Sequence, residues 1–517
     1  MNAKLSRAIA EIERSGAASH LASINRGLEK ESLRVSPNGV LSSTPHPRTL
    51  GSALSHSSIT TDYSESLLEF ITPVFTDVEA MLSFLTDLHL YTYKNIGDEI
   101  LWTNSMPCIL HGDESIPIAD YGSSNIGFMK HVYRRGLAWR YGRLMQTIAG
   151  VHYNFSLPEA FFTALDGIDS ADNRSAHYFN LIRNFHRHCW LVLYLFGSSP
   201  AICQTFVEGR KHNLDVFGEH SFYLPKGTTL RMSDLGYQNS AQSSIRVCTN
   251  SLSEYVRTLR AATEQSWPAY EEIGVKVDGE YRQLNTNLLQ IENEFYTVIR
   301  PKRTINSGEK PSCALNRRGV EYIEVRSIDL DPFSPIGVSQ ELIQFMDAFL
   351  LFCMFEPSPP ISVDEDKEIA HNRNVTVMNG RDPATQLHIN GEARSIRDEA
   401  VVMFEGISAF AEMLDRYAGG EHVELAERER HKFIDPDTTP SAIILDEMRE
   451  HGDAYFEFAM RWSQRHKRYF DSLNLSPEKE RQLKLEAESS LERTAELEAE
   501  QKESFDEFLR RYMAASC

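Results

Sequence analysis

Residues 146–155 read QTIAGVHYNF, and polar and apolar side chains alternate along the second half of this stretch. In a β-strand, successive side chains point to opposite faces of the sheet, so positions i and i+2 share a face. Gln146, His152 and Asn154 then lie on one face. The apolar side chains at positions 151, 153 and 155 lie on the other face and are typical of a core. The stretch predicts a strand that packs on one side and offers chemistry on the other.

The same pattern recurs in three other strand-like segments. Glu29 and Glu31 share a face in the first segment. Glu69 stands among apolar neighbours in the second. Glu324 and Arg326 share a face in the third. The segments are GLEKE at residues 27–31, DYSESLLEF at 62–70 and EYIEVRS at 321–327.

Acidic side chains inside apolar runs need an explanation, because burying a lone charge is costly unless it is paired or binds a metal. Several such acids on inward faces indicate a hard-cation site built from oxygen ligands. Two other interpretations remain open: each acid pairs with an arginine, or it lies on the solvated face of an antiparallel sheet. The spacing alone does not establish that these strands are neighbours.

The composition excludes several classes of protein. The 517 residues are 41% hydrophobic and include 27 Phe and 20 Tyr, which is ample for a folded core. A net charge of −20 disfavours nucleic acid and anionic membrane as partners. The seven cysteines form no CxxC pair, and residues 1–16 resemble an amphipathic helix rather than a signal peptide. We expect a soluble cytoplasmic monomer.

The chain changes character after residue 340. Short strand patterns alternate with helical ones from about residue 24 to 340, whereas the chain beyond the PSPP run at 357–360 is mainly helical. We therefore predict a catalytic body at 1–345 and a helical region at 346–517 that packs on the same body. A last amphipathic helix is expected to begin at Ser476. The predicted strands are 29–35, 67–71, 146–155 and 321–328, and the predicted helices include 78–90 and 176–194.

Familiar nucleotide and hydrolase motifs are missing from the sequence. It contains no GxxxxGK[ST] and no GxGxxG after a strand, which disfavours a P-loop or a Rossmann enzyme. It also contains no GxSxG and no HExxH. A phosphate-handling site, if present, must therefore be built in another way.

Six long stretches of the sequence between about residue 24 and 340 can be compared with known families. The stretches are RGLEKESLRV, ITTDYSESLLEFITP, YGRLMQTIAGVHYNFSLP, TTLRMSDLGY, NLLQIENEFYTVIRPKR and GVEYIEVRSIDLDPFSPIGV. They occur in the family's order and closely resemble the proteobacterial type of glutamate–cysteine ligase, also called γ-glutamylcysteine synthetase, in the glutamine synthetase-like superfamily.

The resemblance implies an α+β fold in which a bent antiparallel sheet forms a funnel-shaped active site with helices packed outside. It also implies ATP-dependent ligation of the γ-carboxylate of L-glutamate to the amine of L-cysteine. The reaction would pass through a γ-glutamyl phosphate and would be the first step of glutathione biosynthesis. Mg²⁺ is the implied cofactor, with Mn²⁺ able to substitute, and ATP is a co-substrate.

Matching motifs carry the family's roles onto numbered residues. Arg231, Arg326 and Asp62 are the implied catalytic residues, the arginines opposing the carboxylates and the transferred phosphoryl group. Gln146 and Asn154 would orient glutamate. The implied metal ligands are Glu29, Glu31, Asp62, Glu69, His152 and Glu324.

The resemblance assigns cysteine to a tyrosine-rich pocket. Tyr133, Tyr237, Tyr296 and Tyr63 would form it, and Tyr63 stands where the family pattern has phenylalanine. The added hydroxyl changes the polarity of the expected thiol pocket. We assign Lys302, in the basic run IRPKR, to ATP binding together with Arg326 of the segment EYIEVRS. The competing interpretation of IRPKR is a solvated basic turn.

Two alternatives to this function remain open at this stage. A related ATP-dependent carboxylate–amine ligase could use another amine in place of cysteine. A non-catalytic metal- or nucleotide-binding regulator could keep the same fold. The aromatic pocket is the feature that distinguishes a cysteine ligase from a ligase that uses another amine. Retention of every acid and arginine in the motifs counts against a non-catalytic regulator.

Overall fold

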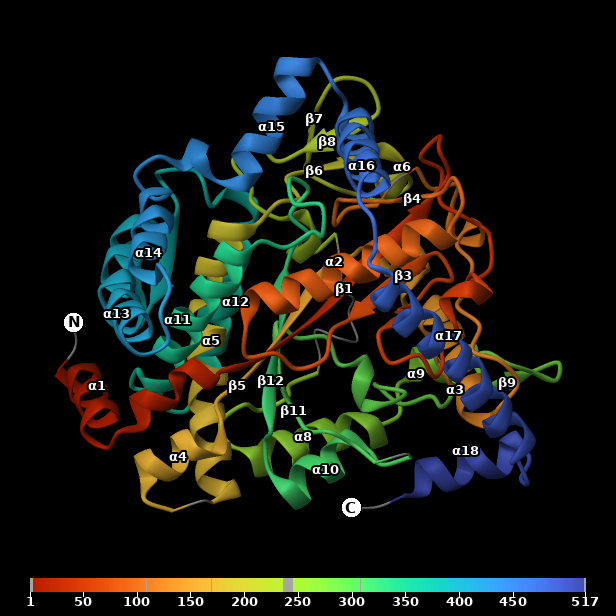
Figure 1. Ribbon diagram of the computed structural model, residues 1–517, viewed down its shortest axis with the longest axis horizontal. Helices are drawn as coiled ribbons and strands as arrows, with labels where there is room; N and C mark the ends of the chain where they lie inside the picture. The colour runs from red at the N-terminus through yellow and green to blue at the C-terminus, as the bar shows by residue number, and fades with distance from the viewer. Residues whose placement is uncertain (1–2, 108, 169, 236–244, 307, 516–517) are drawn as a thin grey trace.

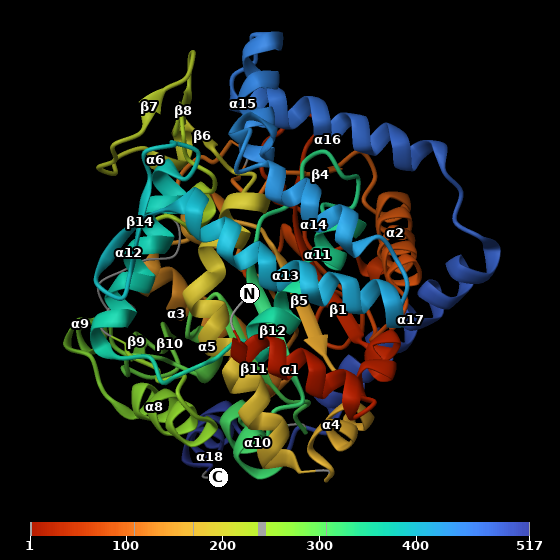
Figure 2. The same ribbon diagram turned by 90° about the vertical axis from the view of Figure 1, so that its left-hand side faces the viewer.

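The computed structural model of the protein describes residues 3–107, 109–168, 170–235, 245–306 and 308–515. One antiparallel sheet of seven strands lies at the centre, and helices surround it (Figures 1 and 2). The strand order is β11-β12-β5-β1-β3-β2, and β4 pairs with the end of β1. The strands are β1 (Asn25–Val35), β2 (Ile59–Thr61), β3 (Leu67–Ile71), β4 (Ile100–Leu101), β5 (Val151–Ser156), β11 (Ile299–Lys302) and β12 (Tyr322–Ile328).

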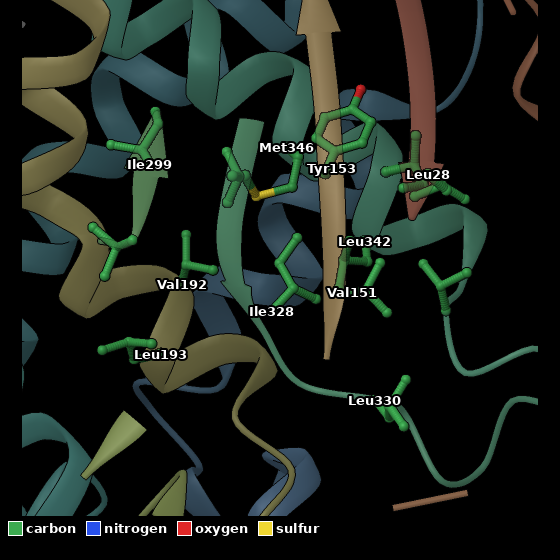
Figure 3. Close-up of a cluster of buried hydrophobic side chains, with 14 of the residues drawn as sticks. Leu28, Val151, Tyr153, Val192, Leu193, Ile299, Ile328, Leu330, Leu342 and Met346 are labelled. Atoms are coloured by element: carbon green, nitrogen blue, oxygen red, sulfur yellow. The ribbon is translucent and has the colours of Figure 1, made fainter. Parts of the chain in front are cut away.

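One face of the sheet carries the main hydrophobic core. Leu28, Val151 and Ile328 are at most 1% exposed there. They pack against two long buried helices, α5 (Ala171–Phe196) and α11 (Gln340–Phe355), as Figure 3 shows. Full burial of one such side chain contributes about 1.5–3 kcal/mol, so this face holds the strands in a fixed plane. The opposite face is left to polar side chains.

A buried ion pair joins the sheet to α11. The guanidinium of Arg26 on β1 donates from Nε and Nη2 to Asp347 Oδ2, at 2.9 and 2.7 Å. The hydroxyl of Tyr153 on β5 donates to Asp347 Oδ1 at 2.6 Å. Arg26 is 6% exposed and Asp347 is fully buried. One carboxylate thus ties two central strands to the helix behind them.

Helices dominate the rest of the chain. After β12 the only strands among the described residues are the hairpin β13–β14, so the predicted α+β class with a mainly helical C-terminal region is confirmed. The boundary proposed at 345/346 falls within α11, and the division into two units stays a prediction. The remaining helices are α1 (Ala3–Arg14), α2 (Val78–Asn95), α3 (Asn125–Tyr141), α4 (Glu159–Asp166), α6 (Gln204–Val207), α8 (Leu252–Glu264), α9 (Pro268–Ile273), α10 (Pro311–Arg318), α12 (Val363–Asn379), α13 (Ile396–Tyr417), α14 (His422–His431), α15 (Pro440–His451), α16 (Tyr455–Ser472), α17 (Pro477–Ala499) and α18 (Phe505–Ala514).

Small antiparallel sheets lie at the periphery of the molecule. Within the ranges that the structure describes, no helix is both long and apolar enough to cross a membrane. The peripheral strands are β6 (Ala201–Cys203), β7 (Asp215–Val216), β8 (Ser221–Tyr223), β9 (Lys276–Val277), β10 (Glu280–Tyr281), β13 (Gln386–Ile389) and β14 (Glu392–Ser395).

Two sequence-based expectations need correction. The stretch 146–155 is not one strand, because Leu144–Thr147 forms a 3₁₀ turn and β5 begins only at Val151. The Thr147 hydroxyl stabilises this turn by donating to the carbonyl of Leu144 at 2.6 Å. The last amphipathic segment does begin after Ser476, but it breaks at residues 500–504 into α17 and α18. Ser504 and Glu507 form a capping box that starts the second helix.

Replacing Asp347 by asparagine tests the buried ion pair. The substitution keeps the side-chain volume but leaves the Arg26 guanidinium without its counter-charge, so we expect the free energy of unfolding to fall by about 3 kcal/mol or more. Chemical denaturation provides the measurement. Tyr153→Phe serves as the matched control, because it removes only the hydroxyl that donates a hydrogen bond to the same carboxylate. This substitution is expected to lower the free energy of unfolding by about 1 kcal/mol. Equal losses in both variants would show that the charge of Arg26 is not what Asp347 neutralises.

Candidate active site

The strand register brings the predicted polar residues onto one face of the sheet. Glu29 on β1 lies opposite His152 on β5, and Glu31 lies opposite Glu69 on β3. Asn154 on β5 lies opposite Glu324 on β12 in the same way. Side chains at directly paired positions have Cβ atoms about 4.5–5.5 Å apart, so four strands contribute to one cluster. The adjacency that the sequence pattern could not establish is therefore present.

His152 lies at the centre of this cluster. Its Nδ1 is 3.1 Å from Glu29 Oε2 and 3.9 Å from Glu324 Oε1, and its Nε2 is 3.7 Å from Glu31 Oε1. One potential ligand atom from each of Glu29, His152 and Glu324 lies within 4.8 Å of the others. The amide of Asn154 donates to Glu29 Oε1 at 2.9 Å and fixes that carboxylate. These three side chains could together hold a divalent cation.

The carboxylate of Glu324 is held between two cations. Lys302 Nζ lies 3.0 Å from its Oε1, and Arg326 Nη1 lies 3.1 Å from its Oε2. Burial opposes ionisation of Glu324, but the charges of Lys302 and Arg326 outweigh burial and hold the pKa of the carboxyl well below its ordinary value. Glu324 is fully buried and nevertheless remains a carboxylate.

Glu31 on β1 and Glu69 on β3 are compensated less fully, although arginine charges also act on them. Desolvation and the charge of Asp62 raise the pKa of Glu31. Desolvation and the charges of Glu29, Asp62 and Glu31 raise the pKa of Glu69 well above its ordinary value. This excess negative charge, offered by oxygen ligands, matches the preference of a hard cation such as Mg²⁺. The residues present therefore fit the implied metal.

A central pocket opens on this face of the sheet and contains about 830 Å³ of space. Arginines and tyrosines line it together with the acids. The 3₁₀ turn that replaces the start of the expected strand still directs Gln146 into the pocket. Of the predicted site residues, the central pocket brings together Glu31, Asp62, Tyr63, Tyr133, Gln146, His152, Arg231, Tyr296 and Arg326.

An outer pocket of about 1240 Å³ lies further along the same strands. Glu29 and Asn154 belong to its lining and connect it to the acid cluster. Its lining also includes apolar residues such as Ile71 and Val74, and cations such as Arg174 and Arg303. The two pockets thus meet where the candidate metal ligands lie.

Arg231 is held rigidly at the wall of the central pocket. Its Nη2 donates to the carbonyl of Arg326 at 2.8 Å, and its Nη1 lies 3.7 Å from Asp329 Oδ1. The guanidinium crosses Gly150 so closely that a Cβ there would lie 2.2 Å from Arg231 Nη2. Any larger residue at position 150 would displace this arginine.

Several buried polar atoms near the central pocket lack hydrogen-bond partners among the described residues. They include Asn154 Oδ1, Arg326 Nε and the hydroxyl of Tyr63. Unsatisfied buried polar groups are costly, and a bound polar ligand supplies the missing partners. The site has the form of a binding pocket, not of a self-satisfied ion-pair network.

The predicted residues are almost all accounted for. Lys302 contacts Glu324, and Glu69 lies across from Glu31, although neither lines the central pocket. Tyr237 lies outside the described residues. The sequence analysis missed Arg134 and Glu294, which line the central pocket from α3 and from the 3₁₀ turn Glu292–Glu294. The run QIENEFY in one of the family-like stretches carried a signal for Glu294, whereas nothing in the sequence singled out Arg134.

Comparisons with known proteins agree with this geometry. A sequence model of the glutamate–cysteine ligase family matches residues 9–376. The glutamate–cysteine ligase of Alcanivorax borkumensis is 48% identical over 507 residues, which cover 96% of this chain and 97% of that protein. The glutamate–cysteine ligase of Pseudomonas paraeruginosa is 48% identical over 524 residues, which cover 100% and 99%.

The fold is also similar to that of a solved structure of this family. The crystal structure of glutamate–cysteine ligase from Francisella tularensis in complex with AMP is 36% identical and superimposes with a TM-score of 0.90. The match covers 95% of this chain and 97% of that one. The likeness extends past residue 350, where the sequence motifs become sparse. By family model, by sequence and by fold, this chain belongs to the glutamate–cysteine ligase family.

Proposed function

We propose that this protein uses ATP to join the γ-carboxylate of L-glutamate to the amine of L-cysteine, the first step of glutathione biosynthesis. The observation that carries the proposal is the junction of two pockets at one carboxylate cluster. Such a junction lets a phosphate donor and a carboxylate acceptor meet beside bound cations. The compartment is the cytoplasm, and the working unit is a monomer.

The outer pocket takes ATP and the central pocket takes the two amino acids. Apolar side chains such as Ile71 and Val74 suit a base and a ribose, and Arg174 and Arg303 suit phosphates. The central pocket offers Arg231 and Gln146 to the charged groups of glutamate. The transferred phosphoryl group then lies near Lys302 and Arg326, between the two pockets.

Magnesium would be held by Glu29, Glu31, Asp62, Glu69, His152 and Glu324. When bound, it neutralises phosphate charge and offsets the repulsion between two anions. The raised pKa of Glu69 supports this assignment, because a cation supplies the compensation that the described side chains do not.

The first step is attack of the glutamate γ-carboxylate on the γ-phosphorus of ATP, which gives an acyl phosphate and ADP. In phosphoryl transfer the protein forms few covalent bonds itself, so the protein contributes mainly by positioning the reactants and stabilising charge. Arg326 is oriented by Glu324, and Arg231 is oriented by Asp329 and the Arg326 carbonyl. Both guanidiniums are fixed before substrate arrives, which is the condition for effective electrostatic stabilisation.

The second step is attack of the neutral cysteine amine on the acyl carbon, which expels phosphate. Tyr63, Tyr133 and Tyr296 enclose the acceptor, and the unpartnered Tyr63 hydroxyl is available to the incoming thiol or amine. Asp62 lies in the same lining and is our candidate for the proton that the amine loses. An enclosed acyl phosphate is also protected from hydrolysis.

A phosphate-release assay tests the function. Purified enzyme is incubated with ATP, glutamate, Mg²⁺ and one candidate amine at a time, and the product is identified by mass spectrometry. Cysteine is expected to give the fastest phosphate release together with a γ-linked dipeptide. Faster turnover with a different amine would show that this amine, and not cysteine, is the substrate. ATP hydrolysis without any peptide product would reject the ligase proposal.

Metal binding should stabilise the protein through the acid cluster. A ligand present at about 100 times its Kd adds about 2.7 kcal/mol to the free energy of unfolding, so saturating Mg²⁺ is expected to raise the thermal midpoint of the wild type. The increase should disappear in Glu29→Gln and in Glu324→Gln, and neither variant should ligate. Glu412→Gln, an exposed acid on α13 that lines neither pocket, is the control and should keep the increase. An undiminished increase in both cluster variants would place the metal elsewhere.

Arg326→Lys tests the need for a planar, two-pronged cation. Lysine keeps the positive charge but cannot contact Glu324 and a phosphoryl oxygen with a rigid fork. We expect kcat to fall by about 10²-fold or more, with a smaller change in the KM for ATP. Steady-state kinetics measures both constants. A wild-type kcat would mean that this arginine has no part in the transition state.

A further inference from the structure

The C-terminal segment from Ser476 to Ala515 forms a strap of two helices, α17 and α18, that runs along one side of the molecule beside α3 (Figure 1). None of its residues lines the central pocket. It nevertheless contacts, one after another, the three parts of the chain that form the pocket wall away from the main core. We call residues 476–515 the C-terminal strap.

The first contact is with the loop that leads into β2 and Asp62. Ser490 on α17 accepts a hydrogen bond from the backbone N–H of Ser52 at 2.9 Å. Arg493 donates to the carbonyl of Ser55 at 2.8 Å. These bonds go to main-chain atoms, so they fix the path of the loop more than they fix any one side chain.

The second contact is with the start of α3, the helix that carries Tyr133. The carboxylate of Glu498 accepts from the N–H of Ser123 at 2.7 Å, and the side-chain carbonyl of Gln501 accepts from the N–H of Asn125 at 2.7 Å. The first N–H groups of a helix have no partner inside the helix. The strap supplies that partner, and it thereby holds the end of α3 in place.

The third contact is apolar and lies behind the tyrosine wall. Leu509 on α18 is 7% exposed and packs with Met129 and Val132 of α3 and with Leu284. The ring of Phe505 meets the rings of Phe128 and Tyr281 edge-on, at centroid distances of 4.6 and 5.0 Å. Helix α18 therefore joins α3 to the segment that begins at Tyr281.

Gln290 transmits this packing to the pocket. Its Nε2 donates to the carbonyl of Tyr133 at 3.2 Å, and its Oε1 accepts from the N–H of Leu284 at 3.0 Å. Gly136 makes room for it, since a Cβ there would lie 2.1 Å from Gln290 Oε1. The backbone N–H of Gln290 donates to Glu294, which lines the central pocket.

We propose that the C-terminal strap is a positioning element for the amine substrate, acting through Leu509 and Phe505 on the wall formed by Tyr133 and Glu294. The inference rests on the proposed function, because that function assigns the tyrosine wall to the amine. Lys302, Glu324 and Arg326, which we assign to phosphate transfer, lie on β11 and β12, and these strands pack on α5. The strap therefore governs acceptor binding separately from ATP binding.

Leu509→Ala and Phe505→Ala test the proposal in the full-length protein. Each variant is expected to raise the KM for cysteine by about tenfold, because small displacements of a binding wall are costly. The KM for ATP should stay within about twofold, since the outer pocket shares no residue with the strap. Arg510→Ala, an exposed site on the same helix, is the matched control and should behave as wild type.

Two further measurements separate positioning from a loss of folded protein. Leu509→Met conserves volume and should restore the KM for cysteine. In a double-mutant cycle, Leu509→Ala should have much less effect in a Tyr133→Ala background, because the strap is argued to act through Tyr133. A fall in kcat with every KM unchanged would overturn the proposal, as would equal rises in the KM for cysteine and for ATP, or fully additive effects in the cycle.

Failure of the proposed function would be recognised independently. The wild type is assayed first with each candidate amine, and the strap variants are then measured with the amine that supports turnover. If that amine is not cysteine, the substrate assignment fails while the strap is still judged by the KM for the true acceptor. If no amine supports turnover, both proposals are rejected.

Discussion

The crowding of like charges on one face of the central sheet is the constraint that organises this protein. Glu29, Glu31 and Glu324 project from strands joined through β5, and Glu69 faces Glu31 across β1 and β3. Without compensation, such a face would repel itself and would be hydrated. Lys302 and Arg326 contact Glu324, and their charges also act on Glu29 and Glu31 respectively. The pKa values of Glu31 and Glu69 nevertheless stay raised, and this is the part of the cluster where we propose that a cation binds.

This arrangement holds only because the other face of the sheet is exceptionally well fixed. Antiparallel pairing sets which carboxylates are neighbours, and a slip of one residue would turn every one of them away from the pocket. The core against α5 and α11 opposes such a slip over the whole length of the strands (Figure 3). Asp347 adds a polar restraint by binding Arg26 and Tyr153 together. Packing and hydrogen bonds on the core face of the sheet, and not interactions within the site, therefore provide the stabilisation that keeps the acids close together.

The sequence predicted the chemistry of the strands better than their extent. Alternation identified the faces of β1, β5 and β12 because period two is a local property. It could not reveal the register that pairs Glu29 with His152, since register depends on long-range packing. It also extended β5 over Gln146, where hydrogen bonds within Leu144–Thr147 favour a 3₁₀ turn. Arg134 was missed because it lies on an ordinary helix, where only tertiary structure shows which side chains reach the pocket.

The central pocket thus has two walls of different origin. The sheet wall holds the groups that we assign to phosphate transfer, and a displacement there would disturb the acids, the arginines and the core at once. The second wall comes from α3 and the segment after Tyr281, and it is braced from outside through Gln290 and α18. Because α18 packs on α3 in the second wall, we expect changes in the strap to affect the acceptor side more than the phosphoryl-transfer side. Such a separation explains how an ATP-dependent ligase can keep one activation chemistry while the identity of the amine is set elsewhere.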